Sequence, residues 1–189
     1  MRRSLAVLLA LLGVAPLAAA APTTYAVDEV HSALLFRIKH LNVAYTYGRF
    51  NDFAGTFVVD DEDLANAKVD LTVQMASVDT GDAKRDQHLR SPDFFDANQF
   101  PTMRFESTSV AKEDVGAYTV TGNLNLHGVT KPVTVMLKKT GEGPDPWGGQ
   151  RIGFEGAFSI KRSDHGMANM LQAVGDTVWI TVAVEGKKQ

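Results

Sequence analysis

The chain has 189 residues, the usual size of one domain and long enough to bury a hydrophobic core. It contains no cysteine, which excludes disulfide bonds, thiolate metal sites and lipid attachment to a signal-peptide cysteine. The formal net charge is −3, and without the two arginines near the N-terminus the balance is 17 basic against 22 acidic residues, which does not suit nucleic-acid binding.

The first twenty residues follow the order of a cleavable signal peptide. Two arginines precede an apolar run at residues 6–12, and the small residues at 18–20 suit a cleavage site. The apolar run is too short to span a bilayer, and an N-terminal membrane anchor is the alternative interpretation. We therefore expect residues 1–20 to be a signal peptide that directs export, and residues 21–189 to form a single domain.

Most of the remaining chain alternates apolar and polar residues with a period of two, which is typical of β-strands with one buried face. Such strands are expected at residues 25–40, 48–59, 68–78, 101–111, 118–127, 133–139, 151–161 and 177–185. A single antiparallel sheet of about eight strands tends to close into a barrel, because closure removes both edges. The expected fold class is therefore all-β.

The segments between these strands carry turn and loop signals. Residues 41–47 are expected to form a loop or an irregular strand end, and residues 60–65 are acidic and helix-like. Residues 141–149 are rich in glycine and proline, which predicts a loop. Residues 163–175 are either another loop or a short helix around 168–171.

The stretch from Gly81 to Phe105 does not follow the β pattern. A short polar helix is expected from Asp82, as its N-cap, to Arg90, and Asp86 and Arg90 can pair on one helix face. Pro92 ends this helix because proline has no N–H to donate. Phenylalanines follow at 94, 95, 100 and 105. Such an insert either plugs one end of a barrel or forms part of a binding site.

The inward faces of the expected strands supply a candidate wall for a ligand, since an eight-stranded barrel is just wide enough to hold one small molecule. The wall residues are Leu34, Phe36, Ile38, Val73, Phe105, Leu124, Leu126, Phe154, Phe158, Ile180 and Val182. Glycines at 55, 122 and 156 fall on the same faces. An inward glycine removes side-chain volume as a tunnel requires, although a bend in the barrel would also use it.

Polar side chains offer weaker signals. The five histidines, His31, His40, His88, His127 and His165, lack the spacing of known metal motifs, so we expect no metal and no other cofactor. A metal site assembled from distant strands is the alternative. His40 ends the apolar face of its strand and is either a core histidine or a head-group contact. Arg85 and His88 share a helix face, which is either solvated or in contact with a polar ligand group.

Catalysis has little support in the sequence. Ser32 follows His31, but neighbours in a strand point to opposite faces and cannot act as nucleophile and base. The acidic run at 60–63 is better explained as a solvated turn than as a paired-carboxylate site.

Four motifs are spread over nearly the whole chain after residue 20: HSALLFRIKHLNVAYTYGRFNDFAGTF at 31–57, SVDTGDAKRDQHLRSPDFFDANQFPTMRFEST at 77–108, VTGNLNLHGVTKPV at 120–133 and GFEGAFSIKRSDHGM at 153–167. With these motifs the chain resembles the YceI-like family of periplasmic lipid-binding proteins. The resemblance implies an extended, lipocalin-like antiparallel barrel of eight strands with a short helical insert. It also implies periplasmic binding of a long isoprenoid chain, such as an isoprenoid quinone or a polyprenyl compound, without an enzymatic reaction.

On this interpretation the Gly81–Phe105 insert forms one end of a ligand tunnel. Phe94 and Phe95 would contact the ligand, and Arg85 or His88 would meet its polar head group. The expected partners are the isoprenoid or a similar long apolar ligand and, transiently, the membrane, while the oligomeric state is left open. Two alternatives remain at this point: an enzyme acting on a lipid-like substrate in the same cavity, and a solid barrel that binds other proteins.

Overall fold

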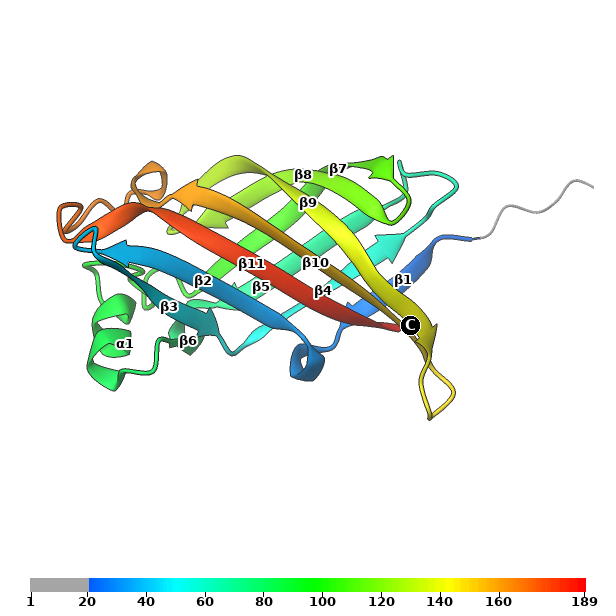
Figure 1. The fold of residues 1–189 in the computed structure, drawn as a ribbon, viewed down its shortest axis with the longest axis horizontal. Helices are drawn as coiled ribbons and strands as arrows, with labels where there is room; N and C mark the ends of the chain where they lie inside the picture. The colour runs from blue at the N-terminus through cyan, green and yellow to red at the C-terminus, as the bar shows by residue number, and fades with distance from the viewer. Residues whose placement is uncertain (1–20) are drawn as a thin grey trace, which may run out of the picture.

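The computed structural model describes residues 21–189, which form one antiparallel sheet that closes on itself as a long barrel (Figure 1). The predicted signal peptide, residues 1–20, lies outside the described residues. Within residues 21–189, no helix has the length and apolar character needed to cross a bilayer.

Eight strands form the closed ring, in the spatial order β1-β4-β5-β7-β8-β9-β10-β11, and β11 pairs back with β1. Their bounds are Thr23–Val27 for β1, Phe53–Val59 for β4, Lys68–Gln74 for β5, Thr102–Asp114 for β7, Ala117–Leu126 for β8, Val129–Pro144 for β9, Gln150–Lys161 for β10 and Val174–Lys188 for β11. The predicted all-β, eight-stranded antiparallel barrel is therefore confirmed.

Three further strands extend the wall at one end: β2 (Ala33–His40), β3 (Ala44–Phe50) and β6 (Val78–Asp79). β11 pairs with β1 near its C-terminal end and with β2 over its N-terminal part, so β1 and β2 lie along the same edge of β11. A 3₁₀ turn at Glu29–His31 separates them, and the Asp28 side chain accepts a hydrogen bond from the Val30 N–H. The predicted single strand at 25–40 is thus two strands with a bend between them.

The connections differ from the prediction in four places. β2 and β3 form a tight hairpin whose turn is limited to residues 41–43, so most of the expected 41–47 loop is strand. β9 runs on to Pro144, because residues 141 and 143, although glycines, still pair with β10 beyond a register shift at Gly153/Phe154. Residues 60–65 form no helix, since the Asp60 carboxylate accepts the N–H groups of Glu62 and Asp63 and closes a turn. Residues 162–165 form a 3₁₀ helix, and residues 169–173 form turns and not the short helix considered around 168–171.

The helix of the insert is α1 (Ala83–Arg90), and the Asp82 side chain caps it by accepting the Arg85 N–H at 2.9 Å, as predicted. The predicted pair of Asp86 and Arg90 is wrong. Asp86 is buried and accepts hydrogen bonds from the N–H and hydroxyl of Thr80, at 2.9 Å and 2.6 Å. Arg90 donates to the carbonyl of Val78 instead. These contacts hold α1 against β6 at one end of the barrel (Figure 1).

Candidate ligand-binding site

Two adjoining cavities occupy the interior of the barrel. The inner cavity, of about 130 Å³, lies among side chains of β4, β5 and β7 to β11. The outer cavity, of about 300 Å³, lies at the end where α1 packs. Leu34, Met103 and Ile180 line both cavities and form a waist between them. Interior space of this extent weighs against the alternative of a solid barrel.

The inner cavity has an almost entirely apolar wall. Val73 and Leu124, 1% and 3% exposed, are typical of its lining. Charged groups gather where the cavity meets the 60–70 segment, and there the Tyr118 hydroxyl donates to Asp61 at 2.5 Å. Burial, together with this hydrogen bond, raises the pKa of Tyr118 to about 12, so its hydroxyl stays neutral. The inner cavity is therefore suited to an uncharged hydrocarbon chain.

The outer cavity combines apolar walls with cationic and hydroxyl groups. Its polar lining residues are Lys39, His40, Thr46, Thr80, Arg85, His88 and Arg162. Among residues 21–189, no aspartate or glutamate lines this cavity. Exposed residues of β2, of α1 and of the 168–173 loop are part of the lining, so the cavity reaches the surface there. We call this opening the mouth. The outer cavity is suited to a group that accepts hydrogen bonds or carries negative charge.

Arg162 is the most buried of these cations, with 4% of its surface exposed. Its guanidinium donates to the carbonyls of Met167, Val174 and Gly175 at 2.6–2.9 Å. These bonds use three of its five N–H groups. Burial lowers the pKa of Arg162, and the charge of Asp176 acts against that shift. Sequence reasoning missed Arg162, although it continues the inward phase of Ile160 along β10.

The two polar residues predicted on the insert also border the outer cavity. Arg85 donates to the hydroxyl of Thr80 at 2.7 Å and to its carbonyl at 2.9 Å. His88 lies 2.9 Å from a carboxylate oxygen of Asp93, and its ring meets Phe94 edge to face at 5.0 Å. Arg85 is held by the residue that precedes the insert and His88 by a residue within it, and both exposed side chains border the mouth.

Every other predicted site residue also lines one of the two cavities. The inner wall contains Leu34, Val73, Phe105, Leu124, Phe154, Phe158, Ile180 and Val182. The outer wall contains Phe36, Ile38, His40, Phe94, Phe95 and Leu126. Residues that the sequence analysis did not select include Phe50, Leu89 and the methionines Met75, Met103, Met167 and Met170. Because methionine side chains adapt their shape, the outer cavity can accommodate ligands of different outline.

The prediction that inward glycines leave room for a tunnel is wrong. A Cβ at Gly156 would lie 2.3 Å from the carbonyl oxygen of Met136, and one at Gly55 would lie 2.1 Å from that of Asp70. At Gly122 the ring of Phe105 covers the position, 2.5 Å from where a Cβ would stand. These glycines permit close approach of neighbouring strands and rings. The cavity space lies between larger side chains.

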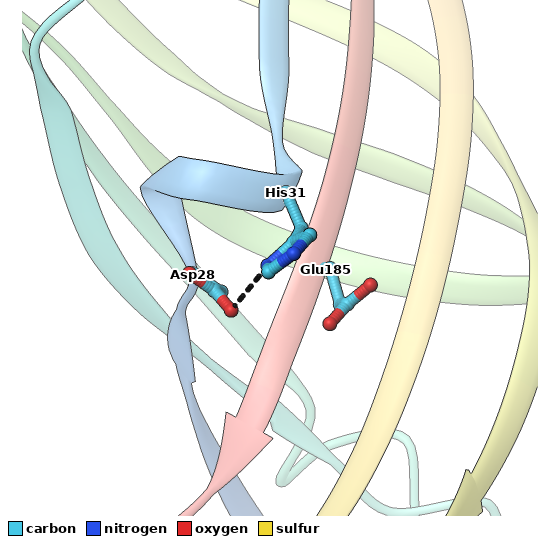
Figure 2. Close-up of side chains that lie close together, drawn as sticks. All are labelled: Asp28, His31 and Glu185. Carbon is cyan, nitrogen blue, oxygen red and sulfur yellow. Dashed lines mark hydrogen bonds and ion pairs between the residues drawn. The ribbon is translucent and has the colours of Figure 1, made fainter. Parts of the chain in front are cut away.

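Outside the cavities, Asp28, His31 and Glu185 lie close together where β1 leads into β2 (Figure 2). Their ligand atoms lie within 4.8 Å of one another, which is close enough to hold a metal ion. Two cations compete for that place, because Arg151 and Lys187 lie 2.8 Å and 2.9 Å from a carboxylate oxygen of Asp28.

Burial of Asp28 favours its neutral form, but hydrogen bonds from Lys187, His31 and Arg151 outweigh burial and hold the pKa of this carboxyl well below its usual range. Arg151 also pairs with Glu185. We interpret the cluster as an ion-pair network that joins the end of β1 to β10 and β11.

We expect removal of metal to leave the protein unchanged, because the carboxylate of Asp28 is already balanced by positive side chains. A thermal melt in the presence of EDTA should give the same Tm as a melt without it. A fall of many degrees on chelation, reversed by adding a divalent cation, would show that the cluster is a structural metal site.

Comparison with known proteins places the chain in a family. The sequence profile of the YceI-like domain matches residues 25–186. A UPF0312 protein of Pseudomonas aeruginosa is 46% identical over 167 residues, which cover 87% of this chain and 87% of the relative. The crystal structure of BcnA from Burkholderia cenocepacia is similar, with a TM-score of 0.77 and 27% identity over 84% of this chain and 98% of that one.

A polyisoprenoid binding domain from Saccharophagus degradans shares the fold at 16% identity, with a TM-score of 0.67 over 87% of this chain and 98% of that one. The profile match across the barrel and the 46% identity over most of both chains show that the chain belongs to the YceI-like domain family.

Proposed function

We propose that the protein binds a long isoprenoid lipid, such as an isoprenoid quinone or a polyprenyl compound, and carries it in the periplasm without catalysing a reaction. The observation that carries this proposal is the pair of adjacent cavities that share the residues of the waist, one apolar and one with a cationic border. The tail would extend through the waist into the inner cavity. The head group would stay in the outer cavity near the mouth.

The inner wall supports the tail position on energetic grounds. Burial of a hydrocarbon chain contributes about 0.8 kcal/mol for each CH₂ and needs no directional bonds. An isoprenoid tail is a linear chain with a small methyl group on each unit, so it could pass a narrow waist. The methyl groups suit a wall of valine, leucine and phenylalanine. The ligand named for the Saccharophagus degradans domain, a polyisoprenoid, belongs to the same chemical class.

The outer cavity supports the position of the head. Its cations and hydroxyls are hydrogen-bond donors, and Arg162 keeps two N–H groups beyond those that bind backbone carbonyls. Quinone carbonyls and phosphate oxygens are both acceptors. The proposed head-group contacts are therefore Arg162, with Arg85, His88 and His40 at the mouth.

The test is mass spectrometry of lipid extracted from protein made with its own first twenty residues and purified without detergent from the periplasm. We expect an isoprenoid in near-stoichiometric amount, and an intact protein mass that begins at or close to Ala21. Protein that carries no lipid and takes up none from added isoprenoid quinone or polyprenyl phosphate would contradict the proposal. Retention of Met1 would contradict export by a cleaved signal peptide.

A further inference from the structure

Exposed aliphatic side chains gather beside the mouth of the outer cavity, on two loops. The β2–β3 turn carries Leu41 and Val43, which are 55% and 86% exposed, and the 168–173 loop carries Met170 and Leu171, which are 48% and 42% exposed. The Leu41 N–H donates to the carbonyl of Ala173 at 2.7 Å and ties the two loops together. Both loops lie at the α1 end of the barrel (Figure 1). We call these two loops the tip.

The backbone conformation of the tip does not explain why apolar residues occupy it. Leu41 and Met170 have φ angles of 49° and 54°, in the left-handed region that favours glycine and asparagine. The two central residues of the β2–β3 turn, Leu41 and Asn42, both have positive φ. Asn-Gly serves such a pair of positions best, and here the first of them is leucine. Leu41 and Met170 are about half exposed and sit on unfavourable backbone, so the turn geometry does not account for apolar residues at these two positions.

Behind the tip, the outer surface of β2, β3 and β11 carries aromatic and cationic side chains. The Arg37 guanidinium lies 4.6 Å from the ring centre of Tyr45 and 5.5 Å from that of Trp179. Lys39 is paired across the hairpin with Tyr45, and Arg37 with Tyr47. We call these five residues the collar. Tyrosine and tryptophan beside lysine and arginine are typical of residues at a membrane–water interface.

The spacing of tip and collar fits the depth of an interface. Lys39 lies two residues before Leu41, which is about 7 Å along a strand. Amphipathic elements at a membrane surface bury their apolar groups about 5–10 Å into the boundary between head groups and acyl chains. With the tip at that depth, the collar would stand level with the head groups.

The β2–β3 hairpin has a net charge opposite in sign to that of the whole chain. From residue 32 to residue 51 the sequence contains Arg37, Lys39 and Arg49 and no acidic residue, whereas the full chain has 22 acidic against 19 basic residues. Basic segments of this kind are attracted to anionic lipid head groups. The collar is thus complementary to an anionic membrane surface and not to a neutral one.

We propose that the tip inserts into the surface of a bilayer that contains anionic lipid, with the collar at the head groups, so that the mouth of the outer cavity opens onto the membrane. The surfaces are continuous, since Lys39, His40 and Met170 line the outer cavity as well. Docking needs no bound isoprenoid and so stands apart from the proposed function. Its purpose, direct exchange of a ligand with the bilayer, rests on that function.

The experiment is flotation of lipid-free protein with vesicles of phosphatidylcholine alone and of phosphatidylcholine mixed with phosphatidylglycerol. The wild type should float with the mixed vesicles and stay behind with the neutral ones. The double variant Leu41→Asn, Val43→Ser should lose at least tenfold in vesicle affinity. It should melt at the same or a higher temperature, since asparagine tolerates the left-handed backbone at position 41.

The matched control is Val30→Ser with Val115→Ser, two exposed valines (79% and 93%) away from the tip, and it should bind vesicles like the wild type. Isoprenoid binding in solution should be unchanged in both double variants, because none of the four residues lines a cavity. No flotation of the wild type, or equal loss in both variants, would overturn docking and leave the isoprenoid result standing. A self-association of the wild type that the tip variant abolishes would assign the tip to contact between copies instead.

Discussion

Replacing Val182 by phenylalanine is expected to lower the affinity for a long-tailed isoprenoid at least tenfold and to leave that for a short-tailed analogue nearly unchanged. Val182 lines the inner cavity and not the outer one. A ring at this position would take up part of the roughly 130 Å³ in which we place the end of the tail. At about 0.8 kcal/mol for each CH₂, displacement of two such groups already corresponds to about tenfold. A ligand short enough to end at the waist would not meet the ring.

The measurement is a titration of lipid-free protein with fluorescent isoprenoid analogues of two chain lengths. Thr181→Phe is the matched control, because position 181 faces the opposite side of β11 and the same ring lies outside the barrel. Denaturant melts check that the fold tolerates the change. If the ring enters cavity space, stability should change by less than about 1 kcal/mol, whereas overpacking of a filled core costs about 1–3 kcal/mol. Strong destabilisation, or equal loss for both chain lengths, would contradict the two-cavity arrangement of the ligand.

The side-chain alternation of β-strands explains why the sequence predicted so many of the residues that line the cavities. Successive residues point to opposite faces, so the apolar phase of each strand identifies its inward residues without knowledge of the strand order. Phe154 and Phe158 on β10, like Leu124 and Leu126 on β8, were assigned to the wall in this way, and they line the cavities. The division into two cavities was not predictable, because it depends on which inward side chains meet across the barrel.

The inward glycines show where the same reasoning fails. Alternation places Gly122 and Gly156 correctly on the inner face, but it does not say whether the space above a glycine is open. That depends on cross-strand register: the ring of Phe105 lies over Gly122, and the Met136 carbonyl and Leu137 side chain approach Gly156. In a single sequence, an inward glycine that leaves a cavity and an inward glycine that permits a close approach show the same alternation.

The sequence analysis missed Arg162 for a different reason. Its charge predicts exposure, and it stands at the start of a loop where the strand pattern ends. It is buried because three carbonyls, from a turn and from the start of β11, converge on its guanidinium. A set of backbone acceptors that folding gathers from a turn and a strand leaves no signal in the pattern of side chains along the sequence.

The largest stability effect is expected for Asp28→Asn, which should lower the free energy of unfolding at neutral pH by about 3 kcal/mol. Asp28 is 3% exposed and accepts from Arg151 and Lys187 at the bend between β1 and β2, where the ring of strands closes. An asparagine would keep the shape but leave the guanidinium of Arg151, which also contacts Asp145 and Glu185, with less negative charge. Asp70→Asn is the matched control, since Asp70 pairs with Arg104 on the exposed surface, where a pair contributes about 1 kcal/mol or less.

The pH dependence separates charge from shape in this prediction. Because the pKa of Asp28 is lower in the folded protein than in the unfolded chain, its contribution is fully present above the unfolded value of about 3.9 and is lost as the pH falls toward the folded value. The variant has no such contribution. Urea melts at several pH values between about 2 and 7 should therefore show the wild type and the variant converging below about pH 4. A constant difference across that range would mean that asparagine disturbs the packing of the bend and that the ion pairs contribute little, because a steric effect does not titrate.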